Sequence, residues 1–323
     1  MTDDHSLAAL QRAITDAHQA LRPHVLVTPL CQSIGLSAMT GCDVYLKCEH
    51  LQHTGSFKYR GASNKLRLLG EQRSRGVVAA SSGNHGQGLA LAARAWDVPV
   101  TVYTTQDASA YKVDAMRALG ARVVGLDMDP LGVELEAAHQ ARQQGKPFIS
   151  PYNDADIIAG QGTIGMELFE QLPGLDAVFV AVGGGGMVSG IAAALSHLSP
   201  GTQIIGCWPA NAPTLQASLL AGRVIEVDEQ ETISDGTAGG VEPGAITFGL
   251  CQRLLSQTVL VSEAEIKAAM RDVAACERWI IEGAAGVAVA GMHKLAEAFR
   301  GKKVAVVLCG RNILLEKYLE AVG

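Results

Sequence analysis

Short apolar runs alternate with Ala- and Leu-rich stretches along most of the chain. Several of these runs are apolar without alternation, which is typical of parallel strands that are covered on both faces. We expect strands at residues 44–49, 76–81, 98–104, 121–126, 177–182, 203–208, 258–262 and 302–308. A helix is expected near the N-terminus, where one apolar face repeats every three or four residues through Leu7, Leu10, Ile14, Ala17 and Leu21. The alternation of strands and helices predicts a doubly wound α/β fold.

The length of 323 residues suits two domains. Residues from about 74 to 150 form a continuous strand–helix series, and we expect them to make a small mobile domain. Residues 1–73 and 151–323 are then expected to make a large domain. No linker stands out by composition, so this division depends on length and on the placement of motifs. Many of the 36 glycines follow expected strands, which favours loops where the backbone approaches a ligand.

Charge and cysteine content narrow the class of protein. The formal net charge of −6 and the lack of a basic run argue against nucleic acid as a partner. The N-terminal residues are acidic where a secretory signal is basic, and no apolar run approaches the ~18 residues of a membrane span. The 7 cysteines are odd in number and form no C-x-x-C pair, so neither a disulfide framework nor a zinc ribbon is expected. We expect a cytoplasmic protein that binds neither nucleic acid nor membrane.

A run of four glycines is the clearest candidate for chemistry. The sequence VAVGGGGMVSGIAAAL, residues 180–195, leads from an expected strand through Gly183–Gly186 into a helix of small residues. Converging backbone N–H groups and a helix N-terminus favour a phosphate or another anion there. The spacing fits neither a P-loop nor a dinucleotide fingerprint. The alternative is a tight turn that lets the strand and the helix pack closely. Because four glycines follow one another, this is the weaker interpretation.

A second candidate follows the expected strand at 76–81. The sequence AASSGNHGQGLALAA, residues 79–93, places Ser81, Ser82, Asn84 and His85 at the start of a helix. A carboxylate is stabilised at a helix N-terminus by the free N–H groups and the dipole. The alternative is an ordinary Ser or Asn cap with a surface histidine. The segment by itself does not decide between the two.

Two single residues complete the candidate site. Lys58 lies in GSFKYRGA, residues 55–62, beside Phe57 and several small residues. A lysine that attacks a carbonyl must be neutral, and desolvation by such neighbours lowers its pKa. Taken alone, Lys58 is more simply a surface lysine in the first turn of a helix. Cys309 ends the last expected strand and is either inert core or a polar group facing a ligand at the strand ends. An anion cradle, a carboxylate site and a reactive lysine together point to pyridoxal phosphate (PLP).

The chain resembles the threonine/serine dehydratase (ammonia-lyase) and serine racemase family of fold-type II PLP enzymes. The resemblance covers residues 15–320 approximately. It is carried by SFKYRGA, SSGNHGQG, IAGQGTIGMEL (158–168), GGGGMVSGIA, SDGTAGG (234–240), IIEGAAG (280–286) and the CGRN segment. It implies a tryptophan-synthase-β-like fold of two doubly wound α/β domains, with PLP in the cleft between them. It also implies a homodimer.

The resemblance implies a role for each candidate residue. Lys58 is expected to hold PLP covalently and later to take the substrate α-proton, with Phe57 beside it. Asn84 is expected to bind the 3-hydroxyl of PLP, and Cys309 to face the pyridine nitrogen. The phosphate is expected on the backbone of Gly183, Gly184, Gly185, Gly186 and Met187. The substrate carboxylate is expected at Ser81, Ser82, Asn84 and His85.

The implied activity is a dehydratase that converts an L-β-hydroxy-α-amino acid to a keto acid and ammonia. L-Threonine and L-serine are the default substrates. The chain departs from the family pattern at Cys309, at Arg311 and in the segment 239–244, which makes hydroxyaspartate, phenylserine or another hydroxy amino acid credible. Whether Arg311 narrows the pocket or lies on the surface stays open at this point.

Two further departures bear on the reaction class. Ser82 stands where many dehydratases carry Ala and racemases carry Ser, so a PLP-dependent racemase with Ser82 as a second catalytic group is the alternative function. Serine racemases of the family hold a divalent cation with acidic residues, and the aligned segment here offers Trp208 and Thr214. Because hard cations prefer carboxylate oxygens, we expect no metal there.

Overall fold

The apolar runs form strands at nearly the expected positions. The computed structural model describes residues 4–323. Its strands are β1 (Leu30–Gln32), β2 (Asp43–Lys47), β3 (Val77–Ala80), β4 (Val100–Thr105), β5 (Arg122–Leu126), β6 (Ala177–Ala181), β7 (Gln203–Pro209), β8 (Gln257–Val261) and β9 (Lys303–Val307). All the expected strands are present. β1 was not expected, because it is only three residues long and has no apolar run.

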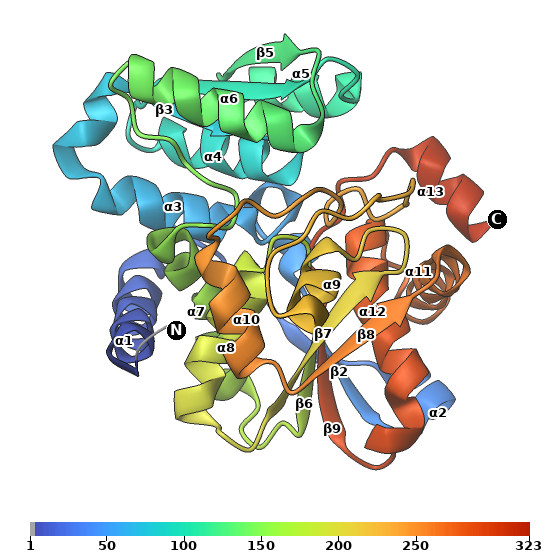
Figure 1. Ribbon diagram of the computed structural model, residues 1–323. Coiled ribbons are helices and arrows are strands. Elements are labelled where there is room, and N and C mark those ends of the chain that lie inside the picture. The colour runs from blue at the N-terminus through green and yellow to red at the C-terminus, as the bar shows by residue number, and fades with distance from the viewer. Residues whose placement is uncertain (1–3) are drawn as a thin grey trace.

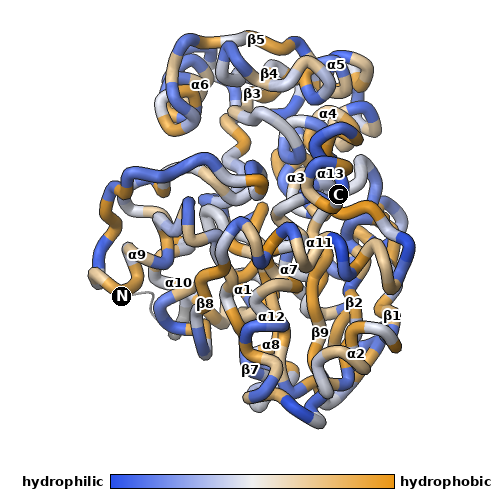
Figure 2. The backbone as a smooth tube through the Cα atoms, turned by 90° about the vertical axis from the view of Figure 1, so that its right-hand side faces the viewer, coloured by the Kyte–Doolittle hydropathy of each residue, from blue (hydrophilic) through white to orange (hydrophobic). Residues whose placement is uncertain are grey.

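The strands divide into two sheets. Six of them form a sheet in the order β1-β2-β9-β6-β7-β8, in which only β1 runs antiparallel to its neighbour. The other three form a parallel sheet in the order β3-β4-β5. The smaller sheet and its helices form the upper lobe in Figure 1, and the larger sheet forms the lower lobe. Figure 2 shows hydrophobic residues along β9 in the middle of the larger sheet, as its burial requires.

Helices cover both sheets. The α-helices are α1 (Asp4–Leu21), α2 (Ile34–Thr40), α3 (Lys58–Leu68), α4 (Asn84–Arg94), α5 (Ala110–Ala118), α6 (Pro130–Gln143), α7 (Ala155–Gln171), α8 (Gly186–Leu198), α9 (Thr214–Ala221), α10 (Ile246–Leu254), α11 (Glu263–Glu277), α12 (Gly283–Leu295) and α13 (Leu315–Val322). Short 3₁₀ helices are η1 (Glu49–Leu51), η2 (His53–Gly55), η3 (Gly70–Arg75) and η4 (Ala296–Phe299). Among residues 4–323, no helix is both long and apolar enough to cross a bilayer.

Two buried apolar clusters contain residues of the small sheet, and only one of them, which includes Val78 and Val133, lies wholly within residues 74–150. The other cluster contains Val100 and Val102 of β4, and it also contains Leu21 of α1 and Leu66 of α3. Helices α1 and α3 therefore pack against the upper lobe although they lie outside residues 74–150. The boundaries at 74 and 150, and the mobility of this part, stay predictions.

Glycines allow the helix that carries Lys58 to lie very close to its neighbours. A Cβ added at Gly160 of α7 would lie 2.6 Å from the Cα of Gly61 in α3. A Cβ added at Gly190 of α8 would lie 2.6 Å from the backbone nitrogen of Gly162 in α7. Real Cβ atoms do not approach backbone so closely, so the IAGQGTIG motif is needed for this packing. The motif thereby holds α3 and α8 at fixed positions on the two sides of α7.

A buried charge network fixes the same helix from the other side. The guanidinium of Arg60 is fully buried and donates to Glu49 at 2.8 Å and to Glu167 at 2.6 and 2.9 Å. Lys47, also fully buried, donates to Glu167 at 2.6 Å. Burial lowers the pKa of Lys47, whereas the two carboxylates oppose that change. Each buried charge thus has a partner of opposite sign, which such a network requires.

Candidate active site

The cleft between the two lobes contains a cavity of about 200 Å³. Its lining comes from the loops that follow β3, β6 and β9 and from the first turns of α3, α6 and α12. Parallel strands direct their carboxyl ends to one edge, where ligands of open α/β sheets bind. Every site residue expected from the sequence lines this cavity: Phe57, Lys58, Ser81, Ser82, Asn84, His85, Gly183, Gly184, Gly185, Gly186, Met187 and Cys309.

The glycine loop lies against the lower lobe and admits no side chain. A Cβ at Gly184 would lie 2.4 Å from Cγ of Tyr152, and one at Gly186 would lie 3.0 Å from the Cα of the same tyrosine. Gly185 has a φ of +88°, in the left-handed region that favours glycine. The loop ends in the first turn of α8, whose leading N–H groups lack intrahelical partners. This arrangement suits an anion at the end of the loop.

The first turn of α4 faces the glycine loop across the cavity. The hydroxyl oxygen of Ser81 accepts from the backbone N–H of Gly83 at 3.1 Å and of Gly86 at 2.9 Å, so its own proton is free to donate. Ser82 is exposed at the rim. The ring of His85 is buried and lies 2.9 Å, Nε2 to carbonyl oxygen, from Ile149. Burial, together with the charge of Lys58, lowers the pKa of His85 to about 3, so this histidine is neutral at physiological pH.

Lys58 is the first residue of α3 and points into the cavity. Its ammonium Nζ donates to the carbonyl of Pro151 at 2.8 Å and lies 5.2 Å from the ring centroid of Phe57. Burial lowers the pKa of Lys58 to about 8, although Glu134, Cys309 and Glu282 partly oppose this. An amine with that pKa has a substantial neutral fraction near neutral pH. The geometry therefore supports a nucleophilic lysine and not a surface charge.

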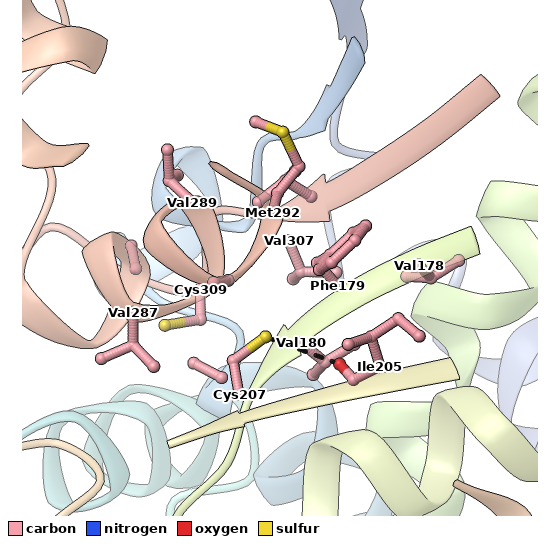
Figure 3. Close-up of a cluster of buried hydrophobic side chains, with 14 of the residues drawn as sticks. Val178, Phe179, Val180, Ile205, Cys207, Val287, Val289, Met292, Val307 and Cys309 are labelled. Atoms are coloured by element: carbon pink, nitrogen blue, oxygen red, sulfur yellow. Dashed lines mark hydrogen bonds between the residues drawn. The ribbon is translucent and has the colours of Figure 1, made fainter. Parts of the chain in front are cut away.

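Cys309 lies at the border between the cavity and the hydrophobic core. Figure 3 shows it beside apolar side chains of β6, β7 and α12, with Val287 and Cys207 nearby. Burial raises the pKa of its thiol well above the usual range, and the charge of Glu282 adds to this. Cys309 is therefore a neutral group at physiological pH. Arg311 is exposed and is not among the cavity-lining residues, so it does not narrow the pocket.

Glu282 is an important cavity residue to which the sequence analysis assigned no role. It is 3% exposed and accepts from Asn84 at 2.8 and 3.1 Å and from the backbone N–H of Asn312 at 2.9 Å. The side chain of Asn312 in turn donates to the Asn84 oxygen at 2.6 Å. A Cβ at Gly310 would lie 2.5 Å from the Glu282 carboxylate, so glycine is required beside it. Glu282 lies within the IIEGAAG motif, which was the feature of the sequence that could have pointed to it.

The segment aligned with the metal site of serine racemases contains other interactions. Trp208 is buried, and the hydroxyl of Thr214 donates to Glu229. The same carboxylate accepts from the backbone N–H of Gly239 at 2.7 Å, which ties the segment to a cavity-lining loop. Within residues 4–323, no three His, Cys, Asp or Glu residues lie close enough to hold a metal ion. The expectation of no metal here stays a prediction.

Comparison with known proteins places the whole chain in one family. A model of the family described as "Pyridoxal-phosphate dependent enzyme" matches residues 21–310. An L-threonine ammonia-lyase of Thermotoga maritima is 42% identical over 302 residues, which cover 93% of this chain and 75% of that protein. An L-threo-3-hydroxyaspartate ammonia-lyase of a Pseudomonas species is 41% identical, covering 90% and 91% of the two chains. The crystal structure of serine racemase from Dictyostelium discoideum superposes with a TM-score of 0.86 at 34% identity, covering 94% and 99%.

Proposed function

The chain belongs to the family of pyridoxal-phosphate-dependent enzymes, and we propose that it is an ammonia-lyase (dehydratase) acting on an L-β-hydroxy-α-amino acid. The reaction breaks the Cα–H and Cβ–O bonds with loss of water, and hydrolysis of the resulting imine takes up one water to give the keto acid and ammonia. Substrates within this class are L-threonine, L-serine, hydroxyaspartate and phenylserine. The observation that carries the proposal is the partly buried amine of Lys58, with its lowered pKa, in one cavity with the glycine loop and Asn84.

The residues of the cavity fit PLP. The glycine loop is free of side chains and leads into the first turn of α8, as a phosphate site requires. We assign the phosphate to Gly183–Gly186 and Met187, the 3-hydroxyl to Asn84, and the pyridine nitrogen to the neutral thiol of Cys309, with Phe57 beside Lys58. The nitrogen Nδ2 of Asn84 carries two hydrogens, so it can donate to the cofactor as well as to Glu282. When bound, PLP supplies the electron sink that stabilises negative charge on the substrate α-carbon.

Lys58 is assigned two tasks. In its neutral form it attaches the cofactor, and after release by substrate its amine takes the α-proton. Both tasks require an unprotonated nitrogen, which the lowered pKa of about 8 provides in part at neutral pH. The first turn of α4 is assigned to the substrate carboxylate, through Ser81, Ser82, Asn84 and His85. Its free N–H groups and dipole favour a negative charge there.

A PLP-dependent racemase is the second candidate function. Inversion at the α-carbon needs a proton donor on the face opposite the lysine, and Ser82 at the cavity rim is the residue we assign to it. The likeness to serine racemase supports this alternative. Measuring the conversion of L-serine to D-serine in the wild type and in Ser82→Ala tests it. Loss of conversion in the variant, with keto acid release retained, would support a racemase role for Ser82.

The ammonia-lyase is tested with the purified, PLP-loaded enzyme. We expect keto acid and ammonia in equal amounts from at least one L-β-hydroxy amino acid of a panel, and none from Lys58→Ala. Borohydride treatment followed by peptide mass analysis is expected to leave a reduced cofactor adduct on Lys58. Adduct formation without keto acid from any substrate would reject the lyase and favour the racemase.

A cytoplasmic homodimer also remains part of the proposal. All seven cysteines are free thiols, which suits a reducing compartment. Sedimentation of the loaded enzyme tests the dimer, which a single species with the mass of one chain would exclude.

A further inference from the structure

Glu134 faces the cavity from the upper lobe. It belongs to the first turns of α6, which begins at Pro130, and it lines the cavity together with Pro130 and Leu131. A Cβ at Gly240 would lie 3.2 Å from Cδ2 of Leu131, so this end of α6 meets the loop that closes the cavity from the lower lobe. Glu134 therefore lies where side chains from both lobes surround a bound ligand.

The carboxylate of Glu134 is not satisfied by the protein. Its oxygen Oε1 is buried and has no hydrogen-bond partner within the described part of the chain. The nearest charged groups that act on it are Glu242, which repels it, and Lys58, which attracts it. Lys58 donates to Pro151 and is assigned to the cofactor, so it is not a dedicated partner. A buried polar atom without a partner costs free energy unless a ligand supplies the missing contact.

Several other ionisable groups that line the cavity have partners of their own. The hydroxyl oxygen of Tyr152, whose pKa is raised by burial and by the charge of Glu134, accepts from the backbone N–H of Glu242 at 2.9 Å and does not bind Oε1 of Glu134. Lys112 is paired with Asp235, and the ring of His85 is bound to the carbonyl of Ile149. Glu282 accepts from Asn84 and from the backbone of Asn312. Neither Lys112 nor the neutral His85 is a hydrogen-bond partner of Oε1 of Glu134. Glu242 is not among the cavity-lining residues and accepts from Asn153 at 2.7 Å, but its charge still acts on Glu134, so two acidic groups lie on this side of the cavity. Glu242 belongs to the segment 239–244 that departs from the family pattern.

The pKa of Glu134 is consistent with a carboxylate that lacks a partner of opposite charge. Burial and, to a lesser extent, the charge of Glu242 raise the pKa of Glu134 to about 7, against the opposing charge of Lys58. A positive group placed against the carboxylate would favour its ionised form and form a charge-assisted hydrogen bond. A negative group placed there would meet two carboxylates instead.

We propose that Glu134 is a specificity-determining residue that selects hydroxy amino acids whose side chain, beyond the hydroxyl-bearing carbon, ends in a positively charged nitrogen. This inference rests on the proposed ammonia-lyase function. The nitrogen donates to the unpartnered Oε1 and neutralises the carboxylate. An anionic side chain, such as that of hydroxyaspartate, is disfavoured at the same position. A methyl group, as in threonine, neither donates to the carboxylate nor is repelled by it.

The first test compares turnover of three substrates of similar size by the PLP-loaded enzyme. They are 3-hydroxy-2,4-diaminobutyrate (cationic), L-threonine (neutral) and L-threo-3-hydroxyaspartate (anionic). We expect kcat/KM for the cationic substrate to be at least tenfold above that for threonine, and hydroxyaspartate to be the poorest of the three. Glu134→Gln is expected to lower kcat/KM for the cationic substrate 10- to 100-fold, mainly through KM, and to change threonine less than threefold.

The second test measures binding without turnover. L-2,4-Diaminobutyrate and L-2-aminobutyrate lack the hydroxyl and cannot undergo the elimination, so their affinities can be measured by calorimetry. We expect the diamino acid to bind at least tenfold more tightly, and this preference to disappear in Glu134→Gln. Glu136→Gln is the matched control, because Glu136 lies on the same helix and accepts from Gln140 instead of facing the cavity. It is expected to keep the wild-type preference.

The two tests separate this inference from the proposed function. If no substrate yields keto acid, the lyase is wrong, and the binding measurement still decides the role of Glu134. If keto acid is released but threonine or hydroxyaspartate is preferred, or if Glu134→Gln leaves the binding preference unchanged, the inference about Glu134 is overturned and the lyase stands.

Discussion

The side-chain amide of Asn84 donates to both carboxylate oxygens of Glu282, at 2.8 and 3.1 Å. The Asn84 oxygen is held at the same time by Asn312 at 2.6 Å. The amide is thereby fixed in one orientation by two residues that lie about 200 positions further along the chain. Glu282 is thus a positioning residue for the group that we assign to the 3-hydroxyl of PLP.

Glu282→Gln is expected to lower kcat/KM by roughly 10- to 100-fold, because a charge-assisted hydrogen bond contributes roughly 1.5–3 kcal/mol. Asn84→Ala is expected to have a similar effect. Both changes break the hydrogen bond between Asn84 and Glu282, so kcat/KM of the double variant should be little lower than that of either single variant. A double-mutant cycle measures this coupling. Losses that simply multiply would show that Glu282 does not act through Asn84.

The contribution of Glu282 to the stability of the cofactor-free protein is expected to fall as pH rises from about 4.5 to 7, whereas the buried neutral His85 and His50 contribute in the opposite direction below pH 6.5. Burial raises the pKa of Glu282 from 4.5 to about 7, although the hydrogen bond from Asn84 opposes this. In this window the folded chain holds a proton that the unfolded chain has lost, so higher pH favours unfolding, by about 3 kcal/mol at most from this group. Urea unfolding at several pH values measures the slope. In Glu282→Gln the free energy of unfolding should change with pH by a more positive slope than in the wild type, because the negative contribution of Glu282 is removed; an unchanged slope would contradict the assignment.

The rate at which the cofactor-free protein takes up PLP is expected to rise with pH. Burial lowers the pKa of Lys58 to about 8, and only the neutral amine attacks a carbonyl. The neutral fraction grows about tenfold between pH 7 and pH 9, so uptake should increase by a similar factor and then level off. Stopped-flow absorbance records the rate. A profile that keeps rising steeply to pH 10.5 would indicate an ordinary lysine.

That the residues which we assign to the cofactor line one cavity was predictable, because most of them belong to local motifs at the ends of strands. The glycine loop, the Ser81–His85 segment and Cys309 all follow apolar runs that could be recognised without any tertiary information. Parallel strands bring such loops to one edge of a sheet. The strands of the fold were predictable for the same reason. Only the three-residue edge strand β1 was not predicted, because it has no apolar run.

The carboxylates of the site were not predictable in this way. Glu134 lies in the second turn of α6, and Glu282 is the residue before α12. Acidic residues are common near helix N-termini, so neither had a special meaning in the sequence. Their importance arises only when distant elements meet, as Asn84 meets Glu282. The buried pairs of Arg60 are a similar case, because a charged residue in a sequence gives no sign of its burial.

Gly184→Ala is expected to raise the apparent Kd for PLP at least tenfold. The new Cβ would lie 2.4 Å from the ring of Tyr152, which is itself buried, so the loop must shift away from its present course. Gly201→Ala is the matched control, because no heavy atom lies within 4 Å of the added Cβ. Titration of the cofactor-free variants with PLP measures both affinities. Equal affinities for the two variants would show that the glycine loop does not form the cofactor site.

Arg60→Met is expected to destabilise the protein by about 3–5 kcal/mol, because it leaves two buried carboxylates with Lys47 as their only cation. The exposed pair of Arg300 with Glu297 provides the control, and Arg300→Met should cause no measurable loss. Guanidinium unfolding of both variants gives the comparison. Adding Glu49→Gln to Arg60→Met should recover part of the loss, since Glu49 is then the carboxylate without an ion pair, whereas Glu167 keeps Lys47. If Arg60→Met costs no more than Arg300→Met, the buried network does not hold α3, and the position of Lys58 must depend on the glycine contacts with α7 alone.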